Sequence, residues 1–239
     1  MTEIHIDKLE HLYKIDNQVS LLKYDNKGKK LFEYSNPSFS GIYEVDVSDP
    51  YKVLLFYRDQ QKIVFLDNTL SELSIKDLTH SENRYFSCLS RSIEGDLWAY
   101  EMNSQKLIKL SGEMEILDES FPLYQEGISG ISPNFISVGI ENVILGDPDL
   151  GVFLFDHLAN YQKKLPIYSF SYLKNMGTKM LYYQDDGFYI YDKEVFEEKR
   201  ILENLEDQKI LFAINRREGQ IVLFNDEAEL KAYRKIGIK

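Results

Sequence analysis

The four histidines and the single cysteine are the side chains that could hold a transition metal or carry nucleophilic chemistry in this sequence. A zinc site needs paired ligands at short spacing, and the sequence has no H-x-x-x-H, no H-E-x-x-H and no second cysteine. Cys88 stands close to Phe86 and Leu89 on an expected strand, which favours a buried thiol over a reactive one. We predict no metal site and no disulfide from these residues, which are His5, His11, His80, His157 and Cys88.

Sequence motifs for hydrolysis and for phosphate binding are missing as well. The nucleophile motif G-x-S-x-G does not occur, and the nearest stretch, Gly127 to Gly130, is not placed at a strand-to-helix turn. Neither G-x-G-x-x-G nor G-x-x-x-x-G-K-[ST] is present. We therefore predict no catalytic residue and no cofactor.

Acidic turns are the remaining source of site chemistry. Four aspartates could place several oxygen ligands, which calcium prefers, near one face of neighbouring repeats: Asp147, Asp149, Asp185 and Asp186. Aspartate is also an ordinary turn residue, because its carboxylate accepts hydrogen bonds from the local backbone, and we favour this interpretation. A hydrolytic site would need a pair of carboxylates or a metal at a central channel, and nothing among the 39 Asp and Glu singles out such a pair.

The elements that would position any site are strands in a repeating unit. Residues 51–73 contain two apolar runs separated by the polar turn Arg58 to Lys62, which predicts a buried hairpin. Weaker copies recur, and the third strand of each copy ends in a similar pair of residues. The second residues of these pairs are 36 to 45 positions apart, about 42 on average, and are Asp25, Asp67, Ser111, Asp156, Asp192 and Arg234.

A repeat of about 42 residues is typical of a four-stranded β-propeller blade. We predict an all-β fold, a single domain over residues 1–239 with six four-stranded blades. The expected blades are Glu3 to Asn36, Ile42 to Leu78, Arg84 to Ser120, Asn134 to Pro166, Ser169 to Leu202, and Lys209 to the end. The last blade lacks an outer strand, so we expect either a three-stranded closing blade or a fourth strand from an N-terminal segment that has been removed. An unprotected edge of this kind favours pairing with another chain.

The longest stretch without a strand or helix period is Phe121 to Pro133, between the third and fourth blades. Loops carry function more often than strands do, so this segment is our predicted contact region for a partner. The residues that we expect to make the contact are its apolar side chains, Phe121, Leu123, Tyr124, Ile128 and Ile131.

Charge and targeting signals narrow the partner classes. A net charge of -11 with scattered lysines and arginines argues against a nucleic-acid partner, because binding to the phosphate backbone needs a basic stripe on the protein. The longest compact apolar run, Val53 to Tyr57, is far shorter than a membrane-spanning helix, so we expect no membrane insertion. The first residues are charged and alternating, unlike a signal peptide. On the residues alone, a cytoplasmic location stays open.

The stretch Tyr34 to Leu73 resembles a group of small six-bladed propeller proteins of Bacteroidota that are largely uncharacterised. The resemblance rests on Tyr34-Ser35-Asn36, Asp46 with Asp49-Pro50, the strand LLFY and Phe65-Leu66-Asp67-Asn68, with weaker likeness over most of the chain. Such proteins are usually exported, so the resemblance implies a periplasmic or outer-membrane-associated location, although the sequence shows no signal peptide. It brings no activity or catalytic residues.

Together these observations predict a non-enzymatic propeller that binds a protein partner, as a component of a cell-envelope assembly. The alternative is a propeller that binds a small ligand, or hydrolyses it with a metal, at the mouth of its central channel.

Overall fold

The computed structural model describes residues 2–79, 84–92, 94–185, 187–202, 211–215, 220–224 and 232–237. These residues form strands and a single short 3-10 helix, which confirms the all-β prediction. The chain divides into two compact units, one of Met1–Asp77 with Leu205–Lys239 and one of Leu78–Asn204. The prediction of one domain over residues 1–239 stays a prediction.

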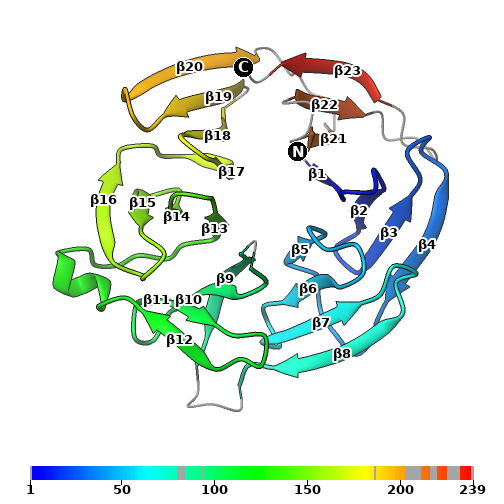
Figure 1. Cartoon of the computed structure of the whole chain (residues 1–239), viewed down its shortest axis with the longest axis horizontal. Helices are drawn as coiled ribbons and strands as arrows, with labels where there is room; N and C mark the ends of the chain where they lie inside the picture. The colour runs from blue at the N-terminus through cyan, green and yellow to red at the C-terminus, as the bar shows by residue number, and fades with distance from the viewer. Residues whose placement is uncertain are drawn as a thin grey trace. The chain divides into compact units, whose positions relative to one another are not determined.

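The first unit contains two antiparallel four-stranded meanders and three strands from the end of the chain (Figure 1). The meanders are β1 (Thr2–Ile6), β2 (Leu12–Asp16), β3 (Ser20–Tyr24) and β4 (Lys30–Ser35), then β5 (Glu44–Asp46), β6 (Val53–Tyr57), β7 (Lys62–Leu66) and β8 (Glu72–Asp77). The C-terminal strands are β21 (Leu211–Asn215), β22 (Gln220–Phe224) and β23 (Ala232–Gly237). The predicted hairpin is confirmed, because Tyr57 of β6 pairs with Lys62 of β7.

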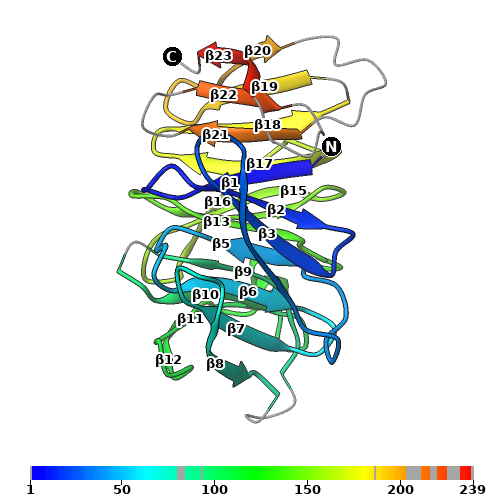
Figure 2. The same cartoon turned by 90° about the vertical axis from the view of Figure 1, so that its right-hand side faces the viewer.

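Strand β1 joins the two ends of the chain. It pairs antiparallel with β2 and parallel with β21, where Thr2 and Glu3 lie opposite Leu211 and Phe212. Figure 2 shows β1 between these two strands. The result is a seven-stranded sheet in the order β23-β22-β21-β1-β2-β3-β4. The prediction of six four-stranded blades is therefore wrong, since five blades have four strands and the described C-terminal segment adds only three strands.

The second unit contains the other three meanders. They are β9 (Phe86–Arg91), β10 (Leu97–Glu101), β11 (Lys106–Leu110) and β12 (Ile116–Glu119); β13 (Phe135–Val138), β14 (Val143–Asp147), β15 (Gly151–Phe155) and β16 (Tyr161–Leu165); and β17 (Phe170–Met176), β18 (Lys179–Gln184), β19 (Gly187–Asp192) and β20 (Glu197–Leu202). The helix η1 (Leu123–Glu126) lies between β12 and β13. Each meander pairs its strands in sequence order.

Burial falls from the middle strands of each meander to the last. Every residue of β6, β10, β14 and β15 is buried, whereas β4, β8, β12 and β20 are largely exposed. Continuous apolar runs such as Val53–Tyr57 result from burial on both faces of a strand. Neighbouring meanders share these faces: Phe170 and Leu173 of β17 pack in one core cluster with Ile144 of β14 and Val152 of β15.

In four of the five meanders, the residue that follows the third strand holds the next turn closed. Oδ1 of Asp156 accepts hydrogen bonds from the backbone N–H groups of Leu158 and Asn160, both at 2.9 Å. The same bonds to positions two and four residues ahead are made by the side chains of Asp25, Asp67 and Ser111. The repeat found in the sequence is therefore a repeat of turn chemistry, because the Asp carboxylate or the Ser111 hydroxyl accepts hydrogen bonds from backbone N–H groups that no strand partner reaches.

We expect Asp156→Ala to lower the free energy of unfolding by about 1 kcal/mol at pH 7, the usual cost of losing a capping side chain. Burial alone would raise the pKa of Asp156, but hydrogen bonds from the Asn160 side chain and from two backbone groups outweigh it and hold the pKa below its usual value. The contribution is therefore present above about pH 4 and is lost as the pH falls through the lowered pKa. Urea titrations at pH 7 and pH 3 check this; an equal difference at both values would contradict it.

Candidate functional site

The predicted contact segment, residues 121–133, leaves the strand pattern between β12 and β13, as Figure 1 shows. It contains no strand and one short helix, η1, which ends at Gly127. Gly127 has φ +75°, a left-handed conformation that glycine adopts without strain, and its N–H closes the turn onto the carbonyl of Tyr124 at 3.2 Å. The segment thus has a defined backbone conformation.

Both ends of the segment are anchored in the second unit. Leu123 is fully buried, and its N–H donates to the carbonyl of Gln105 at 2.9 Å. At the other end Ile131 is buried, and the N–H of Ser132 donates to Oδ2 of Asp147 at 2.7 Å. An apolar side chain and a backbone hydrogen bond therefore fix each end.

Two aromatic rings face solvent on either side of the first anchor, Leu123. Phe121 is 70% exposed and Tyr124 is 55% exposed, while Ile128 is half-buried. Of the five residues expected to make the contact, Leu123 and Ile131 are core residues in this conformation, so they hold the segment rather than present a surface. The prediction of a contact at this segment remains a prediction, and it now rests on Phe121 and Tyr124.

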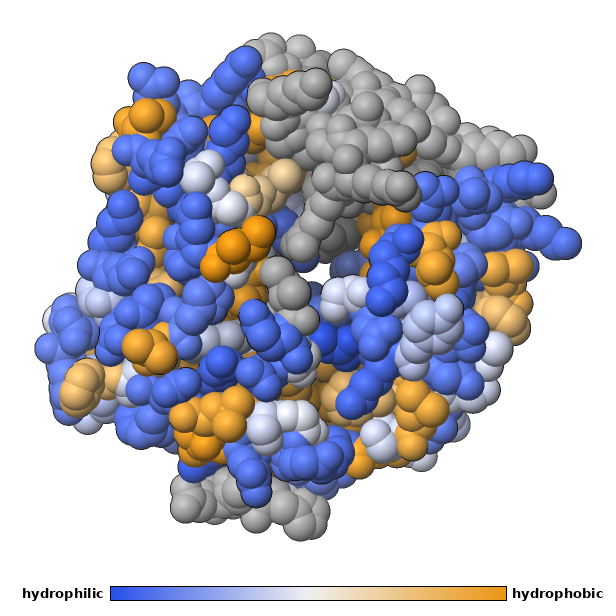
Figure 3. Space-filling model, viewed as in Figure 1, coloured by the Kyte–Doolittle hydropathy of each residue, from blue (hydrophilic) through white to orange (hydrophobic). Residues whose placement is uncertain are grey.

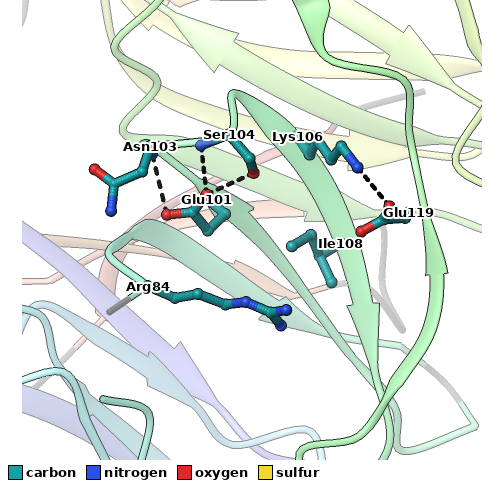
Figure 4. A pocket seen from close by; sticks show the side chains of 7 residues that line it. All are labelled: Arg84, Glu101, Asn103, Ser104, Lys106, Ile108 and Glu119. Carbon is teal, nitrogen blue, oxygen red and sulfur yellow. Dashed lines mark hydrogen bonds and ion pairs between the residues drawn. The ribbon is translucent and has the colours of Figure 1, made fainter. Parts of the chain in front are cut away.

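A polar pocket of about 510 Å³ opens on the third meander (Figure 4). Its lining residues are Arg84, Glu101, Asn103, Ser104, Lys106, Ile108 and Glu119. Nζ of Lys106 forms an ion pair with Glu119. The carboxylate of Glu101 accepts hydrogen bonds from the backbone N–H groups of Tyr85, Asn103 and Ser104 and from the Ser104 hydroxyl.

These bonds determine what Glu101 can do. Desolvation would raise its pKa, but the hydrogen bonds from Ser104, Tyr85 and Asn103 outweigh burial and leave the pKa below its usual value. A general acid or base working near neutral pH needs a raised carboxyl pKa. Glu101 therefore acts as a structural acceptor that closes the turn between β10 and β11.

One histidine is oriented by a carboxylate. His11 Nδ1 lies 3.1 Å from Oδ2 of Asp7, and the hydroxyl of Tyr13 donates to the same oxygen at 2.9 Å. Oδ1 of Asp7 accepts from the N–H groups of Leu9 and His11, which is the turn pattern described for Asp156. This cluster thus has a structural explanation in the turn between β1 and β2.

Two further histidines lie within the described residues. His157 Nε2 lies 3.0 Å from the carbonyl oxygen of Ile140, and its ring centroid is 6.4 Å from that of Trp98. His5 lies in β1 opposite Tyr13, and His80 is outside the described residues. Cys88 is a buried thiol, as its strand position predicted.

The acidic turns behave as turn residues where the structure describes them. Asp147 is buried and its Oδ1 accepts from the N–H groups of Asp149 and Leu150. Asp149 is exposed, Asp185 has φ +53°, and Asp186 lies outside the described residues. No group of three or more His, Cys, Asp or Glu side chains in the described ranges is arranged to hold a metal ion.

A buried lysine cluster was missed by sequence reasoning. Nζ of Lys193 donates to Oδ1 of Asn142 at 2.9 Å and to Oδ1 of Asn175 at 2.8 Å, and Nδ2 of Asn175 donates back to Asn142. Burial lowers the pKa of Lys193 to about 8. A Cβ at Gly139 would lie 2.6 Å from Nδ2 of Asn175, so only glycine allows this approach. No sequence motif predicts the cluster, because its members are 18 to 51 residues apart in the sequence.

Comparison with known proteins establishes the fold. No protein-family model matches the chain, and no curated protein matches it. A solved structure of catalytically inactive virginiamycin B lyase from Staphylococcus aureus with quinupristin superposes with a TM-score of 0.66 at 12% identity, covering 100% of this chain and 84% of that one. The β-propeller prediction is confirmed.

Two further solved structures have a fold similar to that of this chain. The Pan2 WD40 domain of Neurospora crassa matches with a TM-score of 0.67 at 10% identity over 94% of this chain and 72% of its own. BamB from Moraxella catarrhalis matches with a TM-score of 0.52 at 12% identity over 95% and 69%. At these identities the similarity shows the fold alone, and it transfers no activity, because one fold carries many functions.

Proposed function

We propose that this chain is a non-enzymatic propeller that binds a protein partner through the segment of residues 121–133. The observation that carries the proposal is the pair of exposed rings, Phe121 and Tyr124, on either side of the fully buried Leu123. Aromatic side chains dominate the binding energy of protein interfaces when they enter a partner's pocket. A segment that is already ordered loses little conformational entropy on binding, so more of that energy appears as affinity.

The location that we propose is the cell envelope. This rests on the resemblance of Tyr34 to Leu73 to exported propellers of Bacteroidota. The part of the chain that the structure describes contains no helix with the length and apolar character that a membrane crossing requires. Fractionation of native cells tests the location, since recovery with the cytoplasmic fraction alone would contradict it.

The alternative, a ligand-binding or hydrolytic propeller, draws on the fold similarity to a lyase and on the His11–Asp7 pair. We rank it second because the Asp7 carboxylate already accepts hydrogen bonds from two backbone N–H groups of its turn and from the Tyr13 hydroxyl. It predicts that a small ligand stabilises the protein, by about 2.7 kcal/mol when the ligand is at a hundredfold excess over its dissociation constant.

Replacing Phe121 and Tyr124 together by alanine should reduce partner capture at least tenfold, because interface hot spots each contribute about 2 kcal/mol or more. The check is affinity purification of the cross-linked protein from its native cell, with quantitative mass spectrometry. Phe196→Ala is the matched control, since Phe196 is 59% exposed in the turn between β19 and β20. Equal recovery by the double variant and the control would refute the assignment.

A further inference from the structure

The negative charge of the chain is concentrated in the part of the sequence that contains the proposed contact segment. From Leu110 to Gln162 there is no lysine or arginine. The other 186 residues hold 28 basic and 30 acidic side chains, so nearly all of the net charge of -11 belongs to this stretch. Its nine acidic residues are Glu113, Glu115, Asp118, Glu119, Glu126, Glu141, Asp147, Asp149 and Asp156.

Three exposed carboxylates are linked to the contact segment, two along the chain and one through hydrogen bonds. Glu119 precedes Phe121 by two positions, and Glu126 follows Tyr124 by two. Asp149 belongs to the turn held by Asp147, the residue that anchors Ser132. Glu119 is paired with Lys106, whereas Glu126 and Asp149 form no ion pair within the described ranges.

The two rings also lack a cationic neighbour, which this chain places over some of its other aromatic rings. The guanidinium of Arg58 lies 3.9 Å from the ring centroid of Tyr43, and Nζ of Lys163 lies 4.4 Å from that of Phe196. In the part of the chain that the structure describes, no cation lies over Phe121 or Tyr124. A cation over an exposed aromatic ring is worth about 0.5 to 1 kcal/mol, and more when desolvated.

We infer that the partner presents a basic segment, rich in arginine or lysine, to this surface. Its cationic groups would lie over Phe121 and Tyr124 and pair with Glu126 and Asp149. This inference rests on the proposed function and adds the chemistry of the partner. Charge complementarity favours a basic segment over a second copy of this chain, whose corresponding surface would also be acidic, and it accelerates association at low salt.

The test uses a fluorescein-labelled octa-arginine peptide and fluorescence anisotropy. We expect the peptide to bind, and both Glu126→Gln/Asp149→Asn and Phe121→Ala/Tyr124→Ala to weaken binding at least fivefold. The control is Glu194→Gln/Glu197→Gln, which removes two exposed carboxylates, one in the β19–β20 turn and one at the first residue of β20. It should change the affinity less than twofold. Thermal unfolding of each variant shows that it is folded.

Several results would overturn the inference. These are no binding of octa-arginine, an equal loss with the control variant, equal binding of an uncharged apolar peptide of the same length, or a dimer through this surface that both pairs of substitutions dissociate. Cell capture separates this inference from the proposed function. If Phe121→Ala/Tyr124→Ala abolishes capture and Glu126→Gln/Asp149→Asn does not, the partner is not basic and the proposed function stands. If neither variant alters capture, the proposed function itself is wrong.

Discussion

Replacing Asp7 with alanine should lower the free energy of unfolding by about 3 kcal/mol, because a hydrogen bond to a charged acceptor contributes about 1.5 to 3 kcal/mol. The Asp7 side chain is fully buried and accepts four hydrogen bonds, from two backbone N–H groups, the His11 ring and the Tyr13 hydroxyl. Without the carboxylate, the buried Tyr13 hydroxyl loses its acceptor, which adds a desolvation cost.

Urea unfolding of Asp7→Ala and Asp25→Ala measures this effect against a matched control. Asp25 makes the same two backbone bonds in the β3–β4 turn of the same meander, but it binds no buried tyrosine and is half-exposed. We expect the Asp25 variant to lose clearly less stability than the Asp7 variant. Similar losses would show that the buried side-chain bonds of Asp7 contribute nothing beyond the turn.

As the pH rises from 7 to 10, the free energy of unfolding of the wild-type protein should increase by about 2 kcal/mol relative to that of Lys193→Met. Burial lowers the pKa of Lys193 to about 8; nearby Glu141 opposes the shift and Lys163 adds to it. Below pH 8 the lysine is charged in both the folded and unfolded states, and folding carries the full desolvation cost. As the pH rises towards the unfolded value of 10.5, that cost disappears while the amine still donates to Asn142 and Asn175.

The difference between the two proteins is the quantity to measure, because other groups titrate in the same range. Burial raises the pKa of Tyr13, Tyr100 and Tyr182, so stability from these tyrosines is present below pH 10 and is lost above it in both proteins. Burial also lowers the pKa of Lys23 in both. Unfolding free energies at pH 7, 8, 9 and 10 should diverge; parallel profiles would show that Lys193 has an ordinary pKa.

The strands and turns could be predicted because their signals are local. A run such as Val53–Tyr57 is apolar because both faces of the strand are buried. An aspartate such as Asp67 recurs after the third strand because its carboxylate accepts hydrogen bonds from the backbone of the next turn. The predicted number of four-stranded blades was wrong because it depends on a strand pairing between residues far apart in the sequence. The parallel pairing of Thr2 with Leu211 joins the two ends of the chain, and no spacing within one repeat reveals it.

The candidate site was predicted as a segment but not side chain by side chain. Residues 121–133 have no hydrophobic period, so the sequence gives no means of separating the buried Leu123 from the exposed Phe121 and Tyr124. Lys193 was missed for a different reason. Lysine is normally exposed, and its burial depends on Asn142 and Asn175, which come from other strands and turns.

Site-specific photocross-linking tests the protein-interaction proposal most directly. A benzophenone amino acid replaces Phe121, Tyr124 or, as the control, Phe196, and native cells producing each variant are irradiated. We predict the same covalent protein adduct from positions 121 and 124 and its absence from position 196. Adducts from position 196 alone, or none from any position while the variants are folded and abundant, would contradict the account and leave ligand binding as the leading function.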